Sequence, residues 1–392
     1  MKVPIAKTKL TVEEYNIISQ PLKNGWLVQG EFVRDFENKF SEFTGIKNSI
    51  AVTSCTTALH LSLSALGFKK DDEAIVPAFT WISTANVVEH LGGKVVFCDI
   101  DLKTFNIDVE KIESLITPKT KAIIPVHLFG LPAEMNKILQ LAEKYNLFVI
   151  EDAACGFGSE YHGQHVGSFG KTGCFSFHPR KAITTGEGGM ITTNDDNFAE
   201  KLRSMRDHGA SITDHQRHHG AKPYLLADYP FAGFNYRMTD IQASIGSTQM
   251  ERAKVIIDER RKIGLEYNLK FKDLNFFQLP FENNDFLHSY QSYPCIYDIK
   301  RISLGKIKSI KNQRNLFMDN LQKDGVSTRP ATHAVHMLKY YSRKYGCKPE
   351  DYPNARIAND CSISLPLYNG LKKEEQNYVV QKIKAHLQCV EL

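Results

Sequence analysis

Short apolar runs alternate with amphipathic segments along residues 48–200. Strands and helices that alternate at this spacing predict a mainly parallel sheet with helices on both faces. The runs of mostly branched or aromatic residues, which predict strands, are residues 49–54, 73–79, 94–100, 121–130 and 147–154. The segments with apolar residues every three or four positions, which predict helices, are residues 56–67, 109–116 and 134–146.

The pattern continues with two strands on either side of a glycine-rich turn, and with a helix whose end at Gly209 suits a C-cap. Residues 239–271 form one uninterrupted amphipathic pattern, which predicts a single long helix leading into a second lobe. Shorter strands and helices then mix, as in an α+β domain. The remaining predicted elements are strands at residues 173–179, 188–195 and 288–299, and helices at residues 197–209, 311–325 and 373–387.

A chain of 392 residues is long for one hydrophobic core. We therefore expect a large α/β domain at residues 1–250 and a small α+β domain at residues 251–392. The net charge of +5 comes without a sustained basic stretch, which argues against nucleic-acid binding. No apolar stretch approaches the length of a membrane span, so we expect a cytoplasmic protein that is not bound to a membrane.

The eight cysteines show no C-x-x-C spacing, and several of them lie inside apolar runs. This pattern favours reduced thiols and gives no indication of a metal site. Residues 210–230 show no periodicity and contain His215, His218 and His219. Clustered histidines can bind a metal, but no acidic or thiol partner stands at ligand spacing, which favours a flexible, cationic loop.

The candidate chemistry centres on Lys181, in the run 174–189. This lysine lies between a short apolar strand that contains Ser176 and a tight turn rich in glycine. The arrangement fixes an amine at a strand end and keeps a phosphate-sized anion within reach of Ser176. Such an amine can form an imine with an aldehyde cofactor. The alternative is a solvated surface lysine beside a turn.

Three other segments carry residues that suit one cofactor, and each has a plainer explanation. Asp152 stands at the end of an apolar strand. An acid at this place could keep the ring nitrogen of pyridoxal phosphate protonated, or it could cap a helix. Thr56 and Thr57 stand at a predicted helix start, which either binds a phosphate or is only an N-cap. Trp81 follows another strand end, where it could stack on a flat heterocycle or fill the core.

Together these segments resemble the DegT–StrS family of sugar aminotransferases, within the fold-type-I pyridoxal phosphate enzymes. The resemblance implies a mainly parallel seven-stranded sheet flanked by helices, plus a smaller C-terminal α+β domain. It also implies a homodimer whose subunits share their active sites. The matching motifs, which extend through nearly the whole chain, are residues 24–40, 53–67, 76–88, 149–159, 176–195 and 233–246.

The family's roles transfer residue by residue. Lys181 matches the lysine that holds the cofactor, Asp152 the partner of the pyridine nitrogen, and Trp81 the aromatic residue stacked on the ring. Asn235 matches an asparagine that reaches the cofactor phosphate from the neighbouring subunit. The residues that match phosphate contacts within the same subunit are Thr56, Thr57 and Ser176.

Two cysteines depart from the family's pattern. Cys55 stands where glycine is usual in the phosphate turn, which restricts the backbone there. Cys155 stands where relatives often have Gln, Glu or His bonded to the phenolic oxygen of the cofactor, so that contact is expected to be weaker or missing. One branch of the family replaces the lysine with histidine and carries out dehydration. Since Lys181 is present here, we expect transamination.

The resemblance implies L-glutamate as amino donor and a nucleotide-linked 4-keto-6-deoxy sugar as acceptor, in the biosynthesis of cell-surface polysaccharide precursors. Within residues 325–341, Arg329, His333 and His336 lie where relatives shape the acceptor pocket. These side chains could also bind a single phosphate, so a small phosphorylated ketone such as dihydroxyacetone phosphate is the alternative acceptor. A nicotinamide-dependent oxidoreductase would suit the parallel sheet, but no G-x-G-x-x-G follows a strand.

Overall fold

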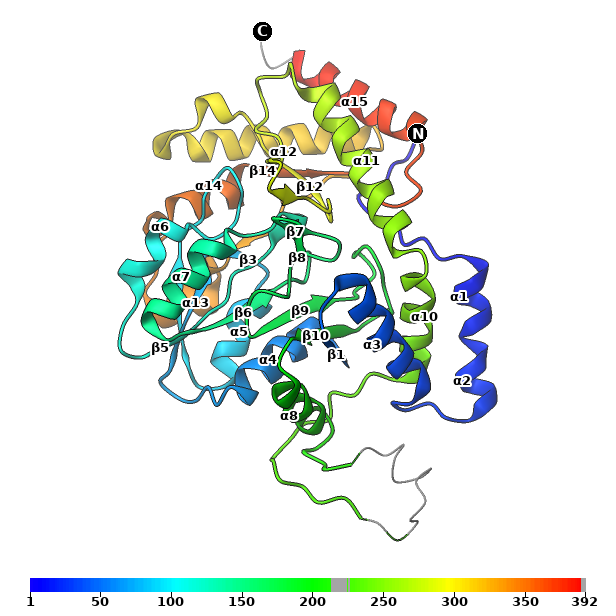
Figure 1. The fold of residues 1–392 in the computed structure, drawn as a ribbon. Coiled ribbons are helices and arrows are strands. Elements are labelled where there is room, and N and C mark those ends of the chain that lie inside the picture. The colour runs from blue at the N-terminus through cyan, green and yellow to red at the C-terminus, as the bar shows by residue number, and fades with distance from the viewer. Residues whose placement is uncertain (213–223, 225, 389–392) are drawn as a thin grey trace.

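A seven-stranded sheet forms the centre of the computed structural model, which describes residues 1–212, 224 and 226–388 (Figure 1). Its strands are β1 (Asn48–Val52), β2 (Glu73–Pro77), β4 (Lys94–Cys98), β5 (Thr120–Ile123), β6 (Phe148–Asp152), β9 (Thr172–Ser176) and β10 (Gly189–Thr193). Their order across the sheet is β1-β10-β9-β6-β5-β2-β4. Of these seven strands, β10 alone runs in the direction opposite to the other six. The predicted mainly parallel α/β sheet is confirmed.

Helices cover both faces of this sheet (Figure 1). The α-helices in the described part of residues 1–250 are α1 (Val12–Ile17), α2 (Ser19–Asn24), α3 (Glu31–Thr44), α4 (Cys55–Ala65), α5 (Ser83–His90), α6 (Val109–Ile112), α7 (Met135–Tyr145), α8 (Asp196–Arg206) and α10 (Asp240–Met250). Ile50 of β1 packs in the same cluster as Leu59 of α4, whereas its neighbour Ala51 packs in the same cluster as Phe36 of α3. Successive side chains therefore enter opposite cores, and this is why every residue of β2 is buried.

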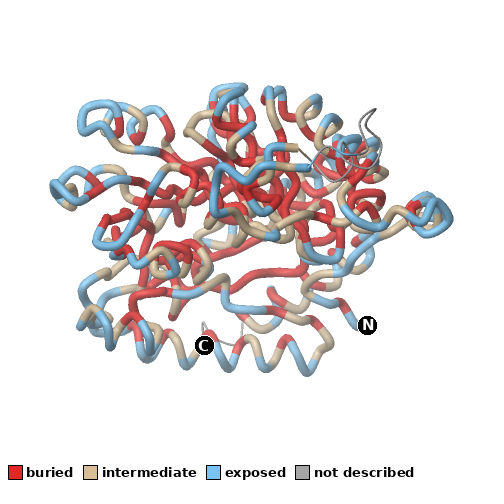
Figure 2. The backbone as a smooth tube through the Cα atoms, turned by 90° about the horizontal axis from the view of Figure 1, so that it is seen from below, coloured by how far each residue is buried: buried red, intermediate tan, exposed pale blue. Residues whose placement is uncertain are grey.

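The C-terminal part carries a small antiparallel pair, β12 (Tyr293–Ile296) with β14 (Ser362–Leu365). Its helices are α11 (Ala253–Phe271), α12 (Ile307–Lys323), α13 (Lys339–Tyr345), α14 (Pro353–Cys361) and α15 (Lys373–Gln388). One hydrophobic cluster includes residues of β1 as well as Ile363 and Val379 from this part. Figure 2 shows the buried stretches running through the middle of the molecule. The proposed division after residue 250 stays a prediction.

Three short strand pairings lie outside the main sheet; two of them join distant segments and the third, β7 with β8, is a local hairpin. The strands are β3 (Phe79–Thr80) with β13 (His333–Ala334), and β7 (Glu160–Tyr161) with both β8 (Gln164–His165) and β11 (Phe286–Leu287). Val3, near the N-terminus, forms a parallel bridge with Val326. The first residues of the chain are therefore held by its C-terminal part.

Several sequence-based boundaries need correction. The single helix predicted at residues 239–271 is wrong, because α10 ends at Met250 and α11 begins at Ala253. The strand predicted at residues 288–299 covers only Tyr293–Ile296. Most of the predicted histidine-rich loop, including His215, His218 and His219, falls outside the described residues, and its described parts at residues 210–212, 224 and 226–230 form no helix or strand. Within the described residues, no cluster of possible metal ligands is found, and no helix is long and apolar enough to cross a membrane.

Candidate active site

Lys181 lies in the loop between β9 and β10, at the edge of the sheet where its parallel strands end. Its backbone N–H closes a turn by donating to the carbonyl oxygen of His178 at 2.8 Å. Its Nζ donates to the Sγ atom of Cys155 at 3.1 Å. The side chain is partly buried, so the amine is neither a freely solvated group nor part of the closed core.

Asp152 is the last residue of β6 and is almost fully buried. Thr84 Oγ1 donates to its Oδ2 at 2.7 Å, and the Ala154 N–H donates to its Oδ1 at 3.1 Å. Burial raises the pKa of the Asp152 carboxyl above its ordinary value, while these two hydrogen bonds and the positive charge of Lys181 act in the opposite direction. Turns follow Asp152, and no helix begins between β6 and β9, which removes the helix-cap explanation.

The start of α4 meets this acid. Ser54 is the N-cap of the helix and Cys55 its first residue. The Sγ atom of Cys55 lies 4.0 Å from Asp152 Oδ1 and donates to the carbonyl oxygen of Cys174 at 3.3 Å. Burial raises the pKa of the Cys55 thiol well above its ordinary value, so the group stays protonated. Cys55 is thus a neutral neighbour of the carboxylate and not a competing anion.

The start of α4 and the strands beside it form a corner whose free N–H groups suit an anion. In the first turn of a helix, the N–H groups of residues such as Cys55 and Thr56 have no carbonyl of their own helix to donate to. Gly189 of β10 pairs with both Val52 and Ser176, which sets Ser176 one strand away from the helix start. A Cβ atom on Gly189 would lie 2.4 Å from the Ser54 carbonyl carbon. Only glycine allows this close approach.

The two threonines of this corner already have hydroxyl partners. Thr56 Oγ1 donates to Ser83 Oγ at 3.0 Å, which links the starts of α4 and α5. Thr57 Oγ1 donates to the Ser54 carbonyl at 2.8 Å and accepts from the Ser54 N–H at 3.0 Å, as part of a capping box. Ser54 and Thr57 therefore hold the helix start in shape, whether or not Thr57 also binds an anion.

Trp81 lies beside His333, one of the residues predicted to bind substrate. The Trp81 side chain is 54% exposed just after β3, so it does not fill the core. Pairing of β3 with β13 sets His333 opposite Thr80, and the rings of Trp81 and His333 lie 5.7 Å apart. Arg329 is also exposed, and its backbone pairs with Ser364. A flat ligand against Trp81 would thus have a histidine at its side.

His336 does not join this group. Its side chain is 0% exposed, and its ring packs 4.6 Å from Tyr352 and 6.5 Å from Phe97. Burial lowers the pKa of His336, which favours a neutral ring over a phosphate-binding cation. A substrate has no access to it, so we leave His336 out of the proposed site.

Asn235 is exposed beside the same corner. Its neighbour Tyr236 accepts a hydrogen bond from the Thr53 N–H at 3.1 Å, and Asn235 itself bridges Asp207 through the backbone. The segment therefore runs alongside the start of α4 and presents the Asn235 side chain outwards. Its predicted contact with a second subunit stays a prediction.

Two hollows adjoin Lys181. The smaller, with about 230 Å³ of empty space, lies between Lys181, Cys155, Ser176 and Gln291. The larger, with about 600 Å³, opens toward the N-terminal segment and α11. Basic side chains predominate on its charged lining: Lys7, Lys9, Arg180, Lys181, Arg252 and Arg260, against the single acid Glu259.

The comparisons with known proteins agree with this geometry. The model of the DegT/DnrJ/EryC1/StrS aminotransferase family matches residues 8–384. The chain belongs to this family. An uncharacterized protein of Methanocaldococcus jannaschii is 39% identical to it over 95% of this chain and 94% of its own length. The GDP-perosamine synthase of Caulobacter vibrioides is 36% identical, over 97% of this chain and 96% of its own.

Solved structures of the family have the same fold. The Streptococcus pneumoniae protein Spr1654 in its PMP form superposes with a TM-score of 0.91 and 27% identity, over 99% of this chain and 100% of its own. Its PLP form gives a TM-score of 0.90. As a member of this family, the chain is an aminotransferase that depends on pyridoxal phosphate.

The residues present fit this cofactor. An amine, a buried carboxylate and a helix start lie at one sheet edge, and they match an aldehyde, a ring nitrogen and a phosphate. Sequence reasoning missed Thr84, the hydroxyl donor to Asp152. Its only signal was a hydroxyl residue three positions after Trp81, in a segment where hydroxyl residues are common.

Proposed function

We propose that this aminotransferase moves an amino group from L-glutamate to the keto group of a nucleotide-linked 4-keto-6-deoxy sugar, in the formation of cell-surface polysaccharide precursors. The observation that carries the proposal is the meeting of Lys181, Asp152 and the α4 start at one edge, beside an exposed Trp81. The relative named GDP-perosamine synthase supports a sugar nucleotide as acceptor.

Pyridoxal phosphate supplies, when bound, an aldehyde that takes up the amino group and a ring that withdraws electrons. Lys181 would hold the aldehyde carbon and, once displaced, would move a proton through its Nζ. Asp152 would hold the ring nitrogen in its protonated form, with its Oδ2 fixed by Thr84. Trp81 would cover one ring face, and the N–H groups at the start of α4 would bind the phosphate together with Thr56, Thr57 and Ser176.

Cys155 gives the amine a neighbour that differs from the family's usual polar residue. A thiol is a weak hydrogen-bond partner, so Lys181 Nζ loses little when it leaves Cys155. The loss of the hydrogen bond to Cys155 would therefore add little to the free energy needed for the amino donor to displace Lys181. A weak contact to the phenolic oxygen of the cofactor is the corresponding disadvantage.

The exposure of Arg329 and His333 favours the sugar nucleotide over the small ketone. A three-carbon phosphate needs a closed cationic pocket to hold it, whereas a diphosphate with its nucleoside extends away from the reacting carbon. The larger hollow beside Lys181 is lined by additional basic side chains that could contact a diphosphate. We further propose a cytoplasmic homodimer in which Asn235 completes the partner's phosphate site.

A half-reaction screen tests the acceptor. The enzyme is first converted to its amine form with L-glutamate and freed of the donor. Single ketones are then offered while the visible absorbance of the aldehyde form is followed. We expect 4-keto-6-deoxy sugar nucleotides to exceed dihydroxyacetone phosphate by at least about tenfold in kcat/KM, which corresponds to ~1.4 kcal/mol.

Lys181→Ala is the matched control for this screen, because it should complete neither half-reaction while keeping its fold. A preference for the three-carbon ketone would contradict the sugar proposal and leave the aminotransferase assignment in place. Failure of glutamate to form the amine state, with another amino acid succeeding, would contradict the proposed donor alone.

A further inference from the structure

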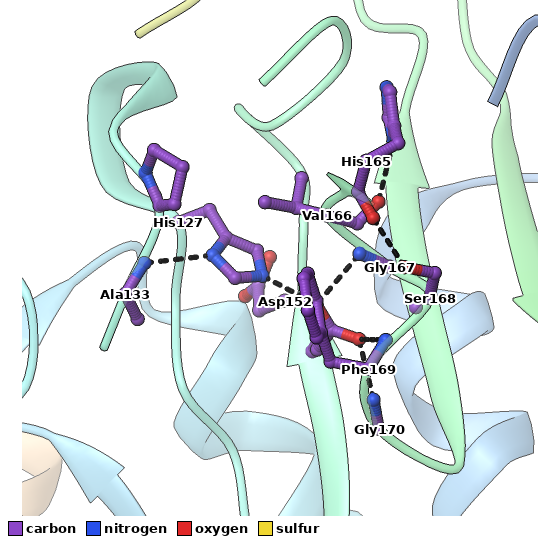
Figure 3. A network of polar contacts seen from close by, with 12 residues as sticks. His127, Ala133, Asp152, His165, Val166, Gly167, Ser168, Phe169 and Gly170 are labelled. Carbon is purple, nitrogen blue, oxygen red and sulfur yellow. Dashed lines mark hydrogen bonds and ion pairs between the residues drawn. The ribbon is translucent and has the colours of Figure 1, made fainter. Parts of the chain in front are cut away.

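Glu151, the residue before Asp152 on β6, is a buried anion with a full set of donors. Neighbouring strand residues point to opposite faces, so its side chain lies on the other side of the sheet from Asp152. Its relative exposure is 0%. Backbone N–H groups of Gly167, Phe169 and Gly170 donate to its carboxylate at 2.7, 2.8 and 2.7 Å. Figure 3 shows these contacts converging on one carboxylate.

The fourth donor is His127, whose ring is also 0% exposed. Its Nε2 lies 2.9 Å from Glu151 Oε2. Its Nδ1 accepts a hydrogen bond from the Ala133 N–H at 3.1 Å (Figure 3). Since Nδ1 accepts, the proton of the neutral ring is on Nε2, and Nε2–H donates to Glu151. This arrangement leaves one negative charge, on Glu151, shared among four donors.

This network also holds the backbone of Asp152. The His127 N–H donates to the Asp152 carbonyl at 3.0 Å, and the Asp152 N–H donates to the Pro125 carbonyl at 2.8 Å. The end of β6 is therefore fixed by main-chain bonds to residues 125–127 and, one residue earlier, by the Glu151 carboxylate. Movement of either Glu151 or His127 must move Asp152.

We infer that Glu151 and His127 are positioning residues that set Asp152 against the cofactor's ring nitrogen. The inference rests on the proposed role of Asp152. A displacement of about 1 Å between reacting groups can cost on the order of a hundredfold in rate. Thr84 holds Oδ2 of Asp152 and the Ala154 N–H holds Oδ1, so both contacts orient the carboxylate, while the backbone at the strand end sets where it stands.

Glu151→Gln tests this positioning role with a side chain of the same size and shape. The amide keeps one acceptor oxygen but presents an NH₂ group to donors that need an acceptor, so the strand end must shift. Glu73→Gln is the control, because Glu73 is also buried and bonded to Lys94 and Thr117, but it lies at the opposite end of the strands. Each variant is made in wild-type and Asp152→Asn backgrounds.

Three quantities are measured on each protein: kcat, KM for the amino donor, and the affinity of the cofactor-free protein for pyridoxal phosphate. We expect Glu151→Gln to lower kcat by roughly 10- to 100-fold and cofactor affinity by several-fold, with little change in donor KM. In the Asp152→Asn background the same substitution should lower kcat by less than about twofold, because the group being positioned is already lost. Glu73→Gln should behave as wild type in both backgrounds.

Equal losses in both backgrounds would overturn the inference, since Glu151 would then act independently of Asp152. Asp152→Asn with near-wild-type kcat would instead overturn the role of Asp152 itself, which is a separate result. If Glu151→Gln does not fold, His127→Gln gives the same test. The glutamine amide can still donate to Glu151, but the hydrogen bond that His127 Nδ1 accepts from the Ala133 N–H is lost. The decrease in kcat caused by His127→Gln should likewise disappear in the Asp152→Asn background.

Discussion

At the residue scale, the charge on Asp152 depends on hydrogen bonds that oppose the effect of its burial. Burial raises the pKa of this carboxyl, whereas Thr84 and the Ala154 N–H favour the ionised form. An acid that keeps a ring nitrogen protonated must itself be ionised at the working pH. The Thr84 hydroxyl is therefore as much a part of the proposed chemistry as the carboxylate it contacts.

Thr84→Val should shift the acid limb of the pH profile of kcat/KM to higher pH. The Thr84 hydroxyl lowers the pKa of Asp152. Without this donor the pKa of Asp152 rises further, so the carboxylate becomes protonated at a higher pH. A hydrogen bond to a charged group contributes about 1.5–3 kcal/mol, which corresponds to a shift of about one pH unit or more. The profile is measured by steady-state kinetics between pH 5 and 9, a range centred roughly on neutrality.

Thr172→Val is the control for this variant, because the Thr172 hydroxyl is also buried but makes no hydrogen bond to Asp152. It should leave the acid limb in place. An unchanged limb in Thr84→Val would show that Thr84 does not govern the ionisation of Asp152.

The sequence predicts strand-end residues better than their supporting contacts. Lys181 and Asp152 each follow an apolar run, and the ends of parallel strands meet at one edge, so their proximity could be predicted. Thr84 and Glu151 could not, because their partners lie 68 and at least 16 residues away in the sequence. The prediction that His336 binds substrate was wrong for a different reason. A histidine suits a phosphate, but packing against Phe97 and Tyr352 buries this one, and the sequence does not show that packing.

At the element scale, the interruption between α10 and α11 shows where periodicity loses its predictive value. Neither proline nor glycine marks the break at Glu251–Arg252. Arg252 forms an ion pair with Glu14 of α1, and Glu251 forms one with Lys39 of α3. These tertiary contacts hold the end of α10 against α1 and α3 while α11 leads into the C-terminal part, and no local signal encodes them.

Gly189→Ala tests whether the approach of β10 to α4 forms the anion corner. The added Cβ would lie 2.4 Å from the Ser54 carbonyl carbon and 2.6 Å from the Cys55 nitrogen, so the helix start must move. We expect a loss of about 1–3 kcal/mol in the free energy of unfolding and roughly tenfold weaker binding of pyridoxal phosphate. Both are measured on the cofactor-free protein, by denaturant unfolding and by cofactor titration.

Gly305→Ala is the matched substitution, since a Cβ there meets nothing within 4 Å. It should change neither quantity. Loss of stability in Gly189→Ala with cofactor affinity unchanged would show that the close approach serves the fold alone.

At the scale of the whole molecule, the overall sheet could be predicted because its first five strands, β1, β2, β4, β5 and β6, are short apolar runs separated by helices. The way the ends of the chain come together could not. Val3 pairs with Val326, and one hydrophobic cluster extends from β1 to α15. Such contacts join residues hundreds of positions apart, and the sequence marks neither partner.

Subunit mixing tests the last feature of the proposed enzyme, an active site shared between two copies of the chain. The exposed Asn235 side chain beside the start of α4 motivates it. Lys181→Ala and Asn235→Ala homodimers should each be nearly inactive, because every site in them lacks one group. A hybrid of the two has one intact site, which takes Lys181 from one subunit and Asn235 from the other, and one site that lacks both. Random exchange of equal amounts should therefore restore about a quarter of wild-type activity.

If Asn235 instead serves its own subunit, every hybrid site keeps one defect, and activity should stay at the mean of the two homodimers even after mass spectrometry has verified subunit exchange.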